Sequence, residues 1–170
     1  MRIRRRDVLK AVAATALAGF APDAYADDRI LIPHEGKTAM TSRPLMTVNI
    51  AAAPPQKLGT VPHGIRSIVP VTGGEFEGPR LRGKVLPGGG DWLLLRPDGV
   101  LELDLRITLE TGDHALIYMT FQGLRHGSYF RTLPRYETSS EAYAFLNRIV
   151  TVGVGEARPD GAVHRIDEIL

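Results

Sequence analysis

The chain has 170 residues, with 21 Lys and Arg against 19 Asp and Glu, and no cysteine. Without cysteine, disulfides, thiol nucleophiles and cysteine-based metal sites are excluded. The first 26 residues hold five basic and two acidic side chains, so the rest of the chain is nearly neutral, with 16 basic and 17 acidic groups. That balance gives no support to nucleic-acid binding, and the remaining length suits one domain with its own core.

Residues 1–26 have the organisation of a cleavable export signal. The basic stretch RIRRR precedes an apolar run over 8–20, and Ala24-Tyr25-Ala26 supplies the small residues that signal peptidase requires. The apolar run is too short for a stable membrane anchor, which needs about 20 residues. The segment RRDVLK at 5–10 resembles a twin-arginine signal, which implies the twin-arginine export machinery as a partner and a periplasmic or secreted bacterial protein. An ordinary Sec signal is the alternative.

The region after the signal reads as an all-β domain. Residues 27–43 lack periodicity and are expected to form an extended arm, whereas from Pro44 onward short apolar runs alternate with Gly/Pro turns about every ten residues. This spacing is typical of a sandwich or barrel. One short helix is expected over 139–146, capped by Ser139 or Ser140. The predicted strands are 45–52, 64–70, 79–86, 91–96, 99–110, 114–124, 128–133, 148–157 and 162–169.

The clearest strand pattern lies in residues 101–110, LELDLRITLE, where apolar and polar side chains alternate strictly. Either the leucines face the core and the polar side chains face solvent, or the polar face lines a lumen; the pattern alone leaves both open. The tetrapeptide Arg-Pro-Asp-Gly occurs at 96–99 and at 158–161, and its turn-forming residues predict a hairpin tip at each copy.

A glycine cluster at 88–90 directly precedes Asp91 and Trp92. A phosphate loop would need a Lys-Ser or Lys-Thr pair after the glycines and a following helix, and neither is present. The carboxylate of Asp91 would also repel phosphate. The cluster is therefore either a bend between two strands or the rim of a pocket that the backbone approaches closely.

Several motifs occur in a fixed order: GGEFEGPRLRGKVLPGGGDW, RPDGVLELDLR, ALIY, YFRTLPRYET and YAFLNR. They closely resemble the motifs of the bacterial and fungal domain-of-unknown-function family number 3237, over residues 44–170. This resemblance implies a single antiparallel β-barrel of about eight strands with an internal cavity, and a family whose activity is mostly unknown.

The motifs that carry this resemblance also contain polar residues that could form a small-molecule site. Asp91 and Glu137 are the candidate general bases and Tyr118 the candidate acid. The candidate substrate-binding residues are Trp92, Asp104, Arg106, Arg131 and Asn147. Each has a structural alternative, such as pairing with an arginine or packing in the core. The five histidines are scattered without ligand spacing, so neither a metal nor a cofactor is expected.

Two functional hypotheses follow for a barrel with such a cavity. The first is a cofactor-free lyase, isomerase or cyclase acting on a carbonyl or aromatic compound, with Arg106 stabilising an oxyanion. The second is a periplasmic protein that binds an apolar metabolite without turnover. A structural or partner-binding protein, including a homo-oligomer, is a third possibility that the sequence leaves open.

Overall fold

The computed structural model describes residues 40–170. The predicted export signal (1–26) and most of the predicted arm (27–43) lie outside this range, and the first strand already begins at Ser42. Within residues 40–170, no helix is long and apolar enough to cross a membrane.

The described part of the chain forms strands joined mostly by short turns, with one 3-10 helix. In chain order the elements are β1 (Ser42–Ala52), β2 (Gln56–Val61), β3 (Gly64–Glu77), β4 (Arg82–Val85), β5 (Gly90–Leu95), β6 (Leu101–Thr111), β7 (Leu116–His126), β8 (Tyr129–Glu137), η1 (Glu141–Arg148), β9 (Thr151–Arg158) and β10 (Gly161–Ile169).

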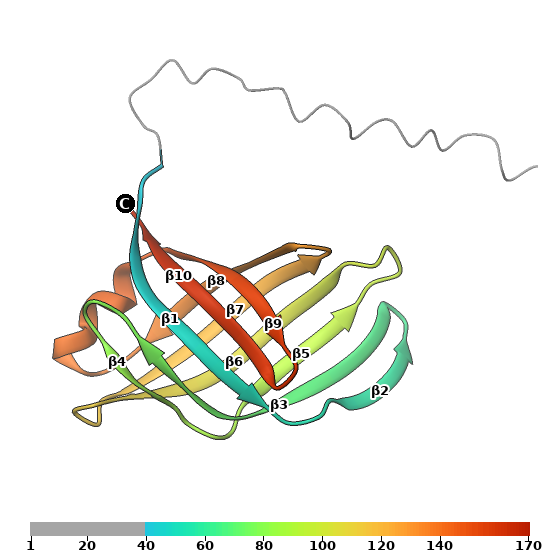
Figure 1. The fold of residues 1–170 in the computed structure, drawn as a ribbon, viewed down its shortest axis with the longest axis horizontal. Helices are drawn as coiled ribbons and strands as arrows, with labels where there is room; N and C mark the ends of the chain where they lie inside the picture. Colours follow the sequence, from blue (N-terminus) through green and yellow to red (C-terminus); the bar gives the residue numbers. More distant parts are fainter. Residues whose placement is uncertain (1–39) are drawn as a thin grey trace, which may run out of the picture. The chain divides into compact units, whose positions relative to one another are not determined.

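These strands close into one antiparallel barrel (Figure 1). Neighbouring strands follow the order β1, β10, β9, β8, β7 and β6, after which β6 pairs with both β4 and β5. Strands β4 and β5 in turn pair with successive parts of the long β3, and the second half of β3 returns to β1, which completes the ring. The predicted fold, a single antiparallel β-barrel of about eight strands with one short helix, is therefore confirmed.

Each of the nine predicted strands overlaps an observed one, and both Arg-Pro-Asp-Gly copies lie at hairpins, between β5 and β6 and between β9 and β10. The prediction missed β2. This strand is mostly exposed and lacks apolar alternation, so pairing with β3 forms it rather than burial of its own side chains. The helix begins after Ser140, one of the two predicted caps, and ends at Arg148, two residues beyond the predicted end; the Ser140 side chain forms no capping hydrogen bond.

The barrel interior is filled by one face of each strand. Leu103, Leu105, Ile107 and Leu109 of β6 are buried, and the polar residues between them face outward. The possibility that the polar face of this strand lines the lumen is therefore wrong. Burying the leucines removes apolar surface from water, whereas turning the charged face inward would have desolvated several ions.

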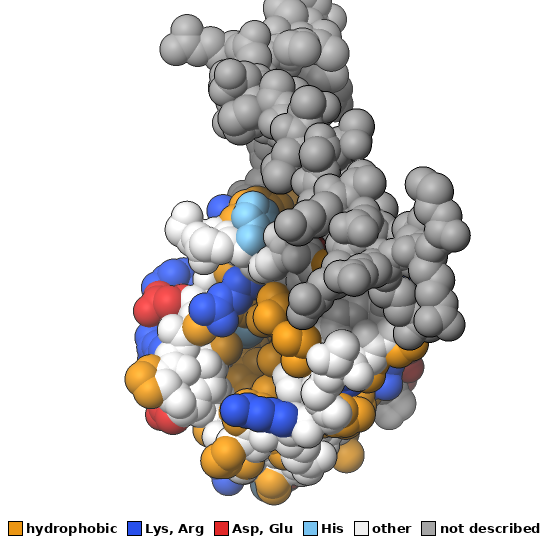
Figure 2. All heavy atoms as spheres, turned by 90° about the vertical axis from the view of Figure 1, so that its right-hand side faces the viewer, with side chains coloured by type: hydrophobic (Ala, Val, Ile, Leu, Met, Phe, Trp, Pro, Cys, Tyr) orange, Lys and Arg blue, Asp and Glu red, His pale blue; other side chains and the backbone are white. Residues whose placement is uncertain are grey.

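The two ends of the barrel differ. At one end η1 packs against the core through Leu146, which is fully buried. The opposite end carries the β2–β3, β5–β6, β7–β8 and β9–β10 hairpins, of which the first two lie at the right-hand edge of Figure 1. Figure 2 looks onto that end and shows a hollow with a hydrophobic floor and basic side chains at its rim. We call these the closed end and the open end.

Candidate functional site

A cavity of about 130 Å³ lies inside the barrel toward the open end. Its wall is mostly apolar and includes Ile50, Val71, Leu93, Leu103, Phe121 and Phe130. Three side chains in this wall carry polar groups, namely Asp91, Arg125 and His164, and they come from β5, β7 and β10. A largely apolar pocket with a few converging polar groups is the usual form of a small-molecule site.

The glycine cluster places Asp91 in this wall. Gly88 and Gly89 have positive φ values of 103° and 76°, which bend the chain before β5. A Cβ atom on Gly89 would lie 2.1 Å from the carbonyl oxygen of Arg106, so this residue must be a glycine for the bend to lie against β6. The bend and the pocket wall are thus parts of one segment, and the two interpretations of the glycine cluster do not exclude each other.

Asp91 is a half-buried carboxyl group without a basic partner among the described residues. Its Oδ1 atom accepts a hydrogen bond of 2.9 Å from the backbone N–H of Asp104. Burial raises the pKa of Asp91 to about 6; the hydrogen bond from Asp104 opposes this rise, and the charge of Asp104 adds to it. At neutral pH the group is mostly ionised, yet its pKa is close enough to 7 for it to accept and return a proton.

His164 lies in the same cavity and is 1% exposed. Its ring centroid lies 4.8 Å from that of Phe121 and 5.1 Å from that of Phe130, with the Phe130 ring edge-on. Burial lowers the pKa of His164 to about 4, so the imidazole is neutral at pH 7. Nδ1 has no hydrogen-bond partner in the part of the chain that the structure describes.

Arg125 is the third polar group of the cavity. It lies on the inward face of β7, in register with Phe130 of β8, and its Cζ atom is 5.7 Å from the centroid of the Phe130 ring. It forms no ion pair with any residue of the range 40–170. The wall of the cavity thus holds a carboxyl group, a neutral imidazole and an unpaired guanidinium.

Of the three predicted catalytic residues, the structure places Asp91 alone in this cavity. Tyr118 lies on the outer face of β7 and is 39% exposed, because Ile117 and Met119 occupy the inward positions on either side of it. Glu137 ends β8 on its outer face and is also exposed. Both residues are near the closed end and are not brought to Asp91.

Trp92, Asp104 and Arg106 also lie on the outer surface of the barrel. Asp104 and Arg106 form an ion pair of 2.9 Å, with their side chains 36% and 49% exposed. The guanidinium of Arg106 lies 5.0 Å from the centroid of the Trp92 ring. These side chains therefore stabilise one another outside the barrel and do not contact the cavity. Asp104 nevertheless acts on Asp91 in two ways, through the hydrogen bond from its backbone N–H and through its charge.

The other two predicted substrate-binding residues have structural contacts. Arg131 donates a hydrogen bond of 3.0 Å to the carbonyl of Phe130 and lies over the Tyr129 ring, outside the barrel. Asn147 accepts a 2.9 Å hydrogen bond from the N–H of Thr138 and donates one of the same length to its carbonyl. Asn147 thus ties η1 to the end of β8.

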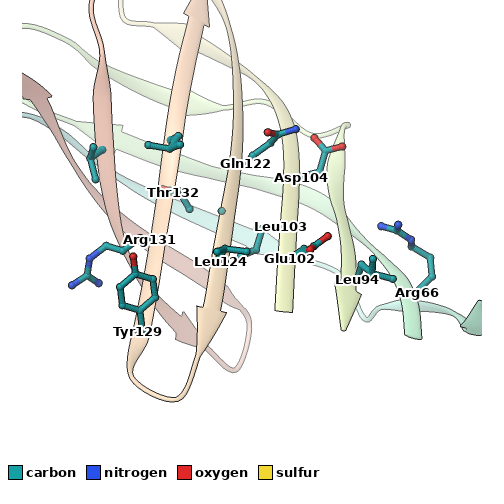
Figure 3. Close-up of a pocket in the computed structure, with 13 residues that line it drawn as sticks. Arg66, Leu94, Glu102, Leu103, Asp104, Gln122, Leu124, Tyr129, Arg131 and Thr132 are labelled. Carbon is teal, nitrogen blue, oxygen red and sulfur yellow. The ribbon is translucent and has the colours of Figure 1, made fainter. Parts of the chain in front are cut away.

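A larger groove of about 760 Å³ runs over the outer face of the barrel (Figure 3). Arg66, Glu102, Asp104, Gln122, Leu124 and Arg131 are among the side chains along it. Its carboxylates already have arginine partners, Arg96 for Glu102 and Arg106 for Asp104. We favour the smaller internal cavity as the candidate site, because its polar groups are desolvated and have no such partners.

The sequence analysis missed Arg125 and His164. It assessed the histidines by metal-ligand spacing, and within residues 40–170 no cluster of three or more His, Asp or Glu could hold a metal ion. A usable signal was nevertheless present. Both residues continue the inward alternation of an apolar strand, Arg125 after Met119 and Phe121, and His164 before Ile166.

Comparison with known proteins agrees with this architecture. The chain is 32% identical over 130 residues to a UPF0311 protein of Rhodopseudomonas palustris. The aligned region covers 66% of this chain and 85% of that protein. A β-barrel-like protein of Acinetobacter baumannii has a similar structure, with a TM-score of 0.76 and 33% identity over 80% of this chain and 99% of its own.

A protein from Penicillium herquei described as an enzyme shares the fold, with a TM-score of 0.69 and 23% identity over 79% of this chain and 98% of its own. The profile of a family described as "Protein of unknown function (DUF3237)" matches residues 40–129 and 126–169. Since these matches span nearly all of the barrel, the chain belongs to the DUF3237 family.

Proposed function

We propose that the open end of the barrel binds one small organic molecule and that Asp91 transfers a proton on it. The protein would then be a cofactor-free lyase, isomerase or cyclase for a carbonyl or aromatic compound. The observation that carries this proposal is the Asp91 carboxyl group in the cavity wall, with a pKa raised to about 6 by burial and no basic partner among the described residues.

The chemistry requires a base near a polarisable substrate. With a pKa near 6, Asp91 can take a proton from a carbon or hydroxyl acid and return it to another position. The backbone N–H of Asp104 holds Oδ1, which fixes the direction of the carboxyl group. Arg125 would bind a substrate oxygen away from Asp91 and so orient the substrate, whereas Arg106, the oxyanion partner expected from the sequence, lies outside the barrel. The fold is compatible with catalysis, since the similar Penicillium herquei protein is described as an enzyme.

Binding without turnover is the second candidate. The small size and mostly apolar wall of the cavity favour it, because retention of an apolar metabolite needs one or two polar anchors and no acid–base pair.

The test begins with native mass spectrometry of the protein purified from its own cells, to identify a retained compound. That compound is then incubated with the protein in D2O, and its conversion or deuterium uptake is followed. We expect Asp91→Asn to lower the rate at least 100-fold, on the order of a lost general base. The matched control is Glu102→Gln, which removes a carboxylate of the outer groove that has no part in the raised pKa of Asp91.

Equal rates in Asp91→Asn and the wild type would overturn the catalytic role. Retention of a compound without conversion or exchange would establish the binding candidate instead.

A further inference from the structure

Arg125 is a cation without an anionic partner among the described residues. It faces the cavity, and its guanidinium contacts the ring of Phe130. It also lies well away from Asp91. On β6, Arg125 is in register with Leu101 and Asp91 with Leu105, a separation of four residues along the strand, or roughly 13 Å. An anionic group bound at Arg125 would therefore avoid the Asp91 carboxylate.

His164 contributes a buried nitrogen atom, Nδ1, that has no hydrogen-bond partner among the described residues. The side chain of His164 is 1% exposed. Native proteins seldom leave a buried polar nitrogen unpaired, because its desolvation costs free energy that no hydrogen bond returns. A ligand hydroxyl could supply the missing hydrogen bond.

The space between these groups fits a ring. A dry protein cavity of about 150 Å³ accommodates one benzene molecule, and this cavity measures about 130 Å³. Phe130 lies between the two polar groups, its ring contacting both Arg125 and His164. Gly155 makes this arrangement possible, because a Cβ atom there would lie 2.6 Å from the Phe130 ring. A single planar ring lying against Phe130 could reach Arg125 with one substituent and His164 with another.

We infer that the cavity takes a single-ring carboxylic acid bearing a hydroxyl group, with its carboxylate against Arg125 and its hydroxyl against Nδ1 of His164. This inference rests on the proposed small-molecule function and names the class of compound that the site selects. Carboxylate recognition by a guanidinium is strong because its hydrogen bonds are charge-assisted.

Calorimetric titration of the full protein with 4-hydroxybenzoate and 4-hydroxybenzyl alcohol at pH 7 tests this class. The two probes share the ring and the phenol but differ in charge. We expect the acid to bind at least tenfold more tightly, about the factor that a charge-assisted contact provides. Arg125→Met should remove this preference by weakening the binding of the acid more than that of the alcohol. Arg131→Met, which changes an arginine on the outer face, is the matched control and should keep the preference.

A second measurement needs no substitution. In ¹⁵N-labelled wild-type protein, 4-hydroxybenzoate should shift the Nδ1 resonance of His164, whereas benzoate, which lacks the hydroxyl, should shift it much less. His126 is exposed and stacked on Tyr129, so its resonance should stay in place with both probes.

The outcomes separate this inference from the proposal on which it rests. Equal binding of acid and alcohol, or an unchanged preference in Arg125→Met, would overturn the carboxylate assignment and leave the cavity as a neutral binding site. If neither probe binds while Asp91-dependent conversion of the retained compound is observed, the compound class is wrong and the proposed function stands. If neither probe binds and no compound is retained or converted, both fail.

Discussion

The two ends of the barrel hold one inward-facing carboxyl group each, in opposite electrostatic states. At the closed end Glu168 accepts hydrogen bonds from Arg43, at 2.8 and 3.0 Å, and from Arg80, at 2.6 Å. These arginines hold the pKa of Glu168 below its usual range. At the open end Asp91 accepts one backbone hydrogen bond, and burial raises its pKa to about 6. The same barrel wall thus carries one carboxylate that is paired with arginines and one unpaired carboxyl group with a raised pKa.

The difference arises from the segments that cover each end. Arg43 belongs to the start of β1 and Arg80 to the turn between β3 and β4, and Arg80 also stacks on Phe145 of η1 at 4.0 Å. The closed end therefore combines a carboxylate paired with two arginines and a helix, η1, that packs against the core through Leu146. The open end has short hairpins, and the polar groups of its cavity, Asp91, Arg125 and His164, have no charged partners among the described residues. The closed end is thus held together by charged and apolar contacts, whereas the cavity groups of the open end stay unpaired among the described residues.

The largest expected effect tests how η1 packs against the core at the closed end. Leu146→Ala removes a fully buried side chain of η1, so we expect a loss of roughly 2–5 kcal/mol in the free energy of unfolding, from lost burial and the cavity left behind. Urea denaturation monitored by circular dichroism measures it. Leu133→Ala is the control, because Leu133 is 59% exposed on the outer face and its loss should change stability by less than about 0.5 kcal/mol. Similar values for both variants would mean that η1 does not stabilise the barrel.

The next effect concerns the open end and depends on pH. The pKa of Asp91 is raised from 3.8 to about 6, so its contribution to stability is fully present below pH 4 and is lost as the pH rises toward 6. The pKa of His164 is lowered from 6.5 to about 4, so its contribution is present above pH 6.5 and is lost as the pH falls toward 4. The two contributions have opposite signs and largely cancel in the wild type.

Single substitutions should separate these contributions. Relative to the wild type, Asp91→Asn should gain about 2 kcal/mol between pH 4 and pH 7, a value reduced for the partial exposure of this group. His164→Asn should change in the other direction, gaining about 3 kcal/mol relative to the wild type between pH 7 and pH 4. Urea midpoints at four pH values in this range measure both. Parallel pH profiles for the wild type and both variants would contradict the buried state of these groups.

The fold could be predicted from sequence because each long strand carries its own evidence. The strict alternation of 101–110 and the turn chemistry of Arg-Pro-Asp-Gly specify strands and hairpins without reference to the rest of the chain. β2 could not be found in this way, since only its partner β3 makes it a strand. The candidate site depends on which face of each strand turns inward. The alternation of apolar side chains indicates the inward face of β6, and the same alternation in β7 and β10 places Arg125 and His164 inward. Asp91 follows the glycine bend into the cavity wall, whereas Tyr118 and Glu137 lie on the outer face, an orientation that membership of a motif does not reveal.

The smallest expected effect tests the ion pair of the closed end. Glu168→Gln removes the charge that Arg43 and Arg80 share while keeping most of the side-chain volume. We expect a loss of about 1 kcal/mol at pH 7, since Glu168 is buried but water partly screens its exposed arginine partners. Because the pKa of Glu168 is lowered, its contribution exists above its ordinary value of 4.5 and is lost as the pH falls below it. The difference from the wild type should therefore shrink at pH 3.

Glu156→Gln provides the matched control for this last prediction. Glu156 pairs with Arg165 at 3.4 Å on β10, but its side chain is 53% exposed, so water screens the pair and the loss should stay below about 0.5 kcal/mol at every pH. If Glu168→Gln behaved like Glu156→Gln, the arginines of the closed end would be no more than surface contacts. The contrast between the two ends would then rest on η1 alone, and the unpaired state of Asp91 would no longer distinguish the open end.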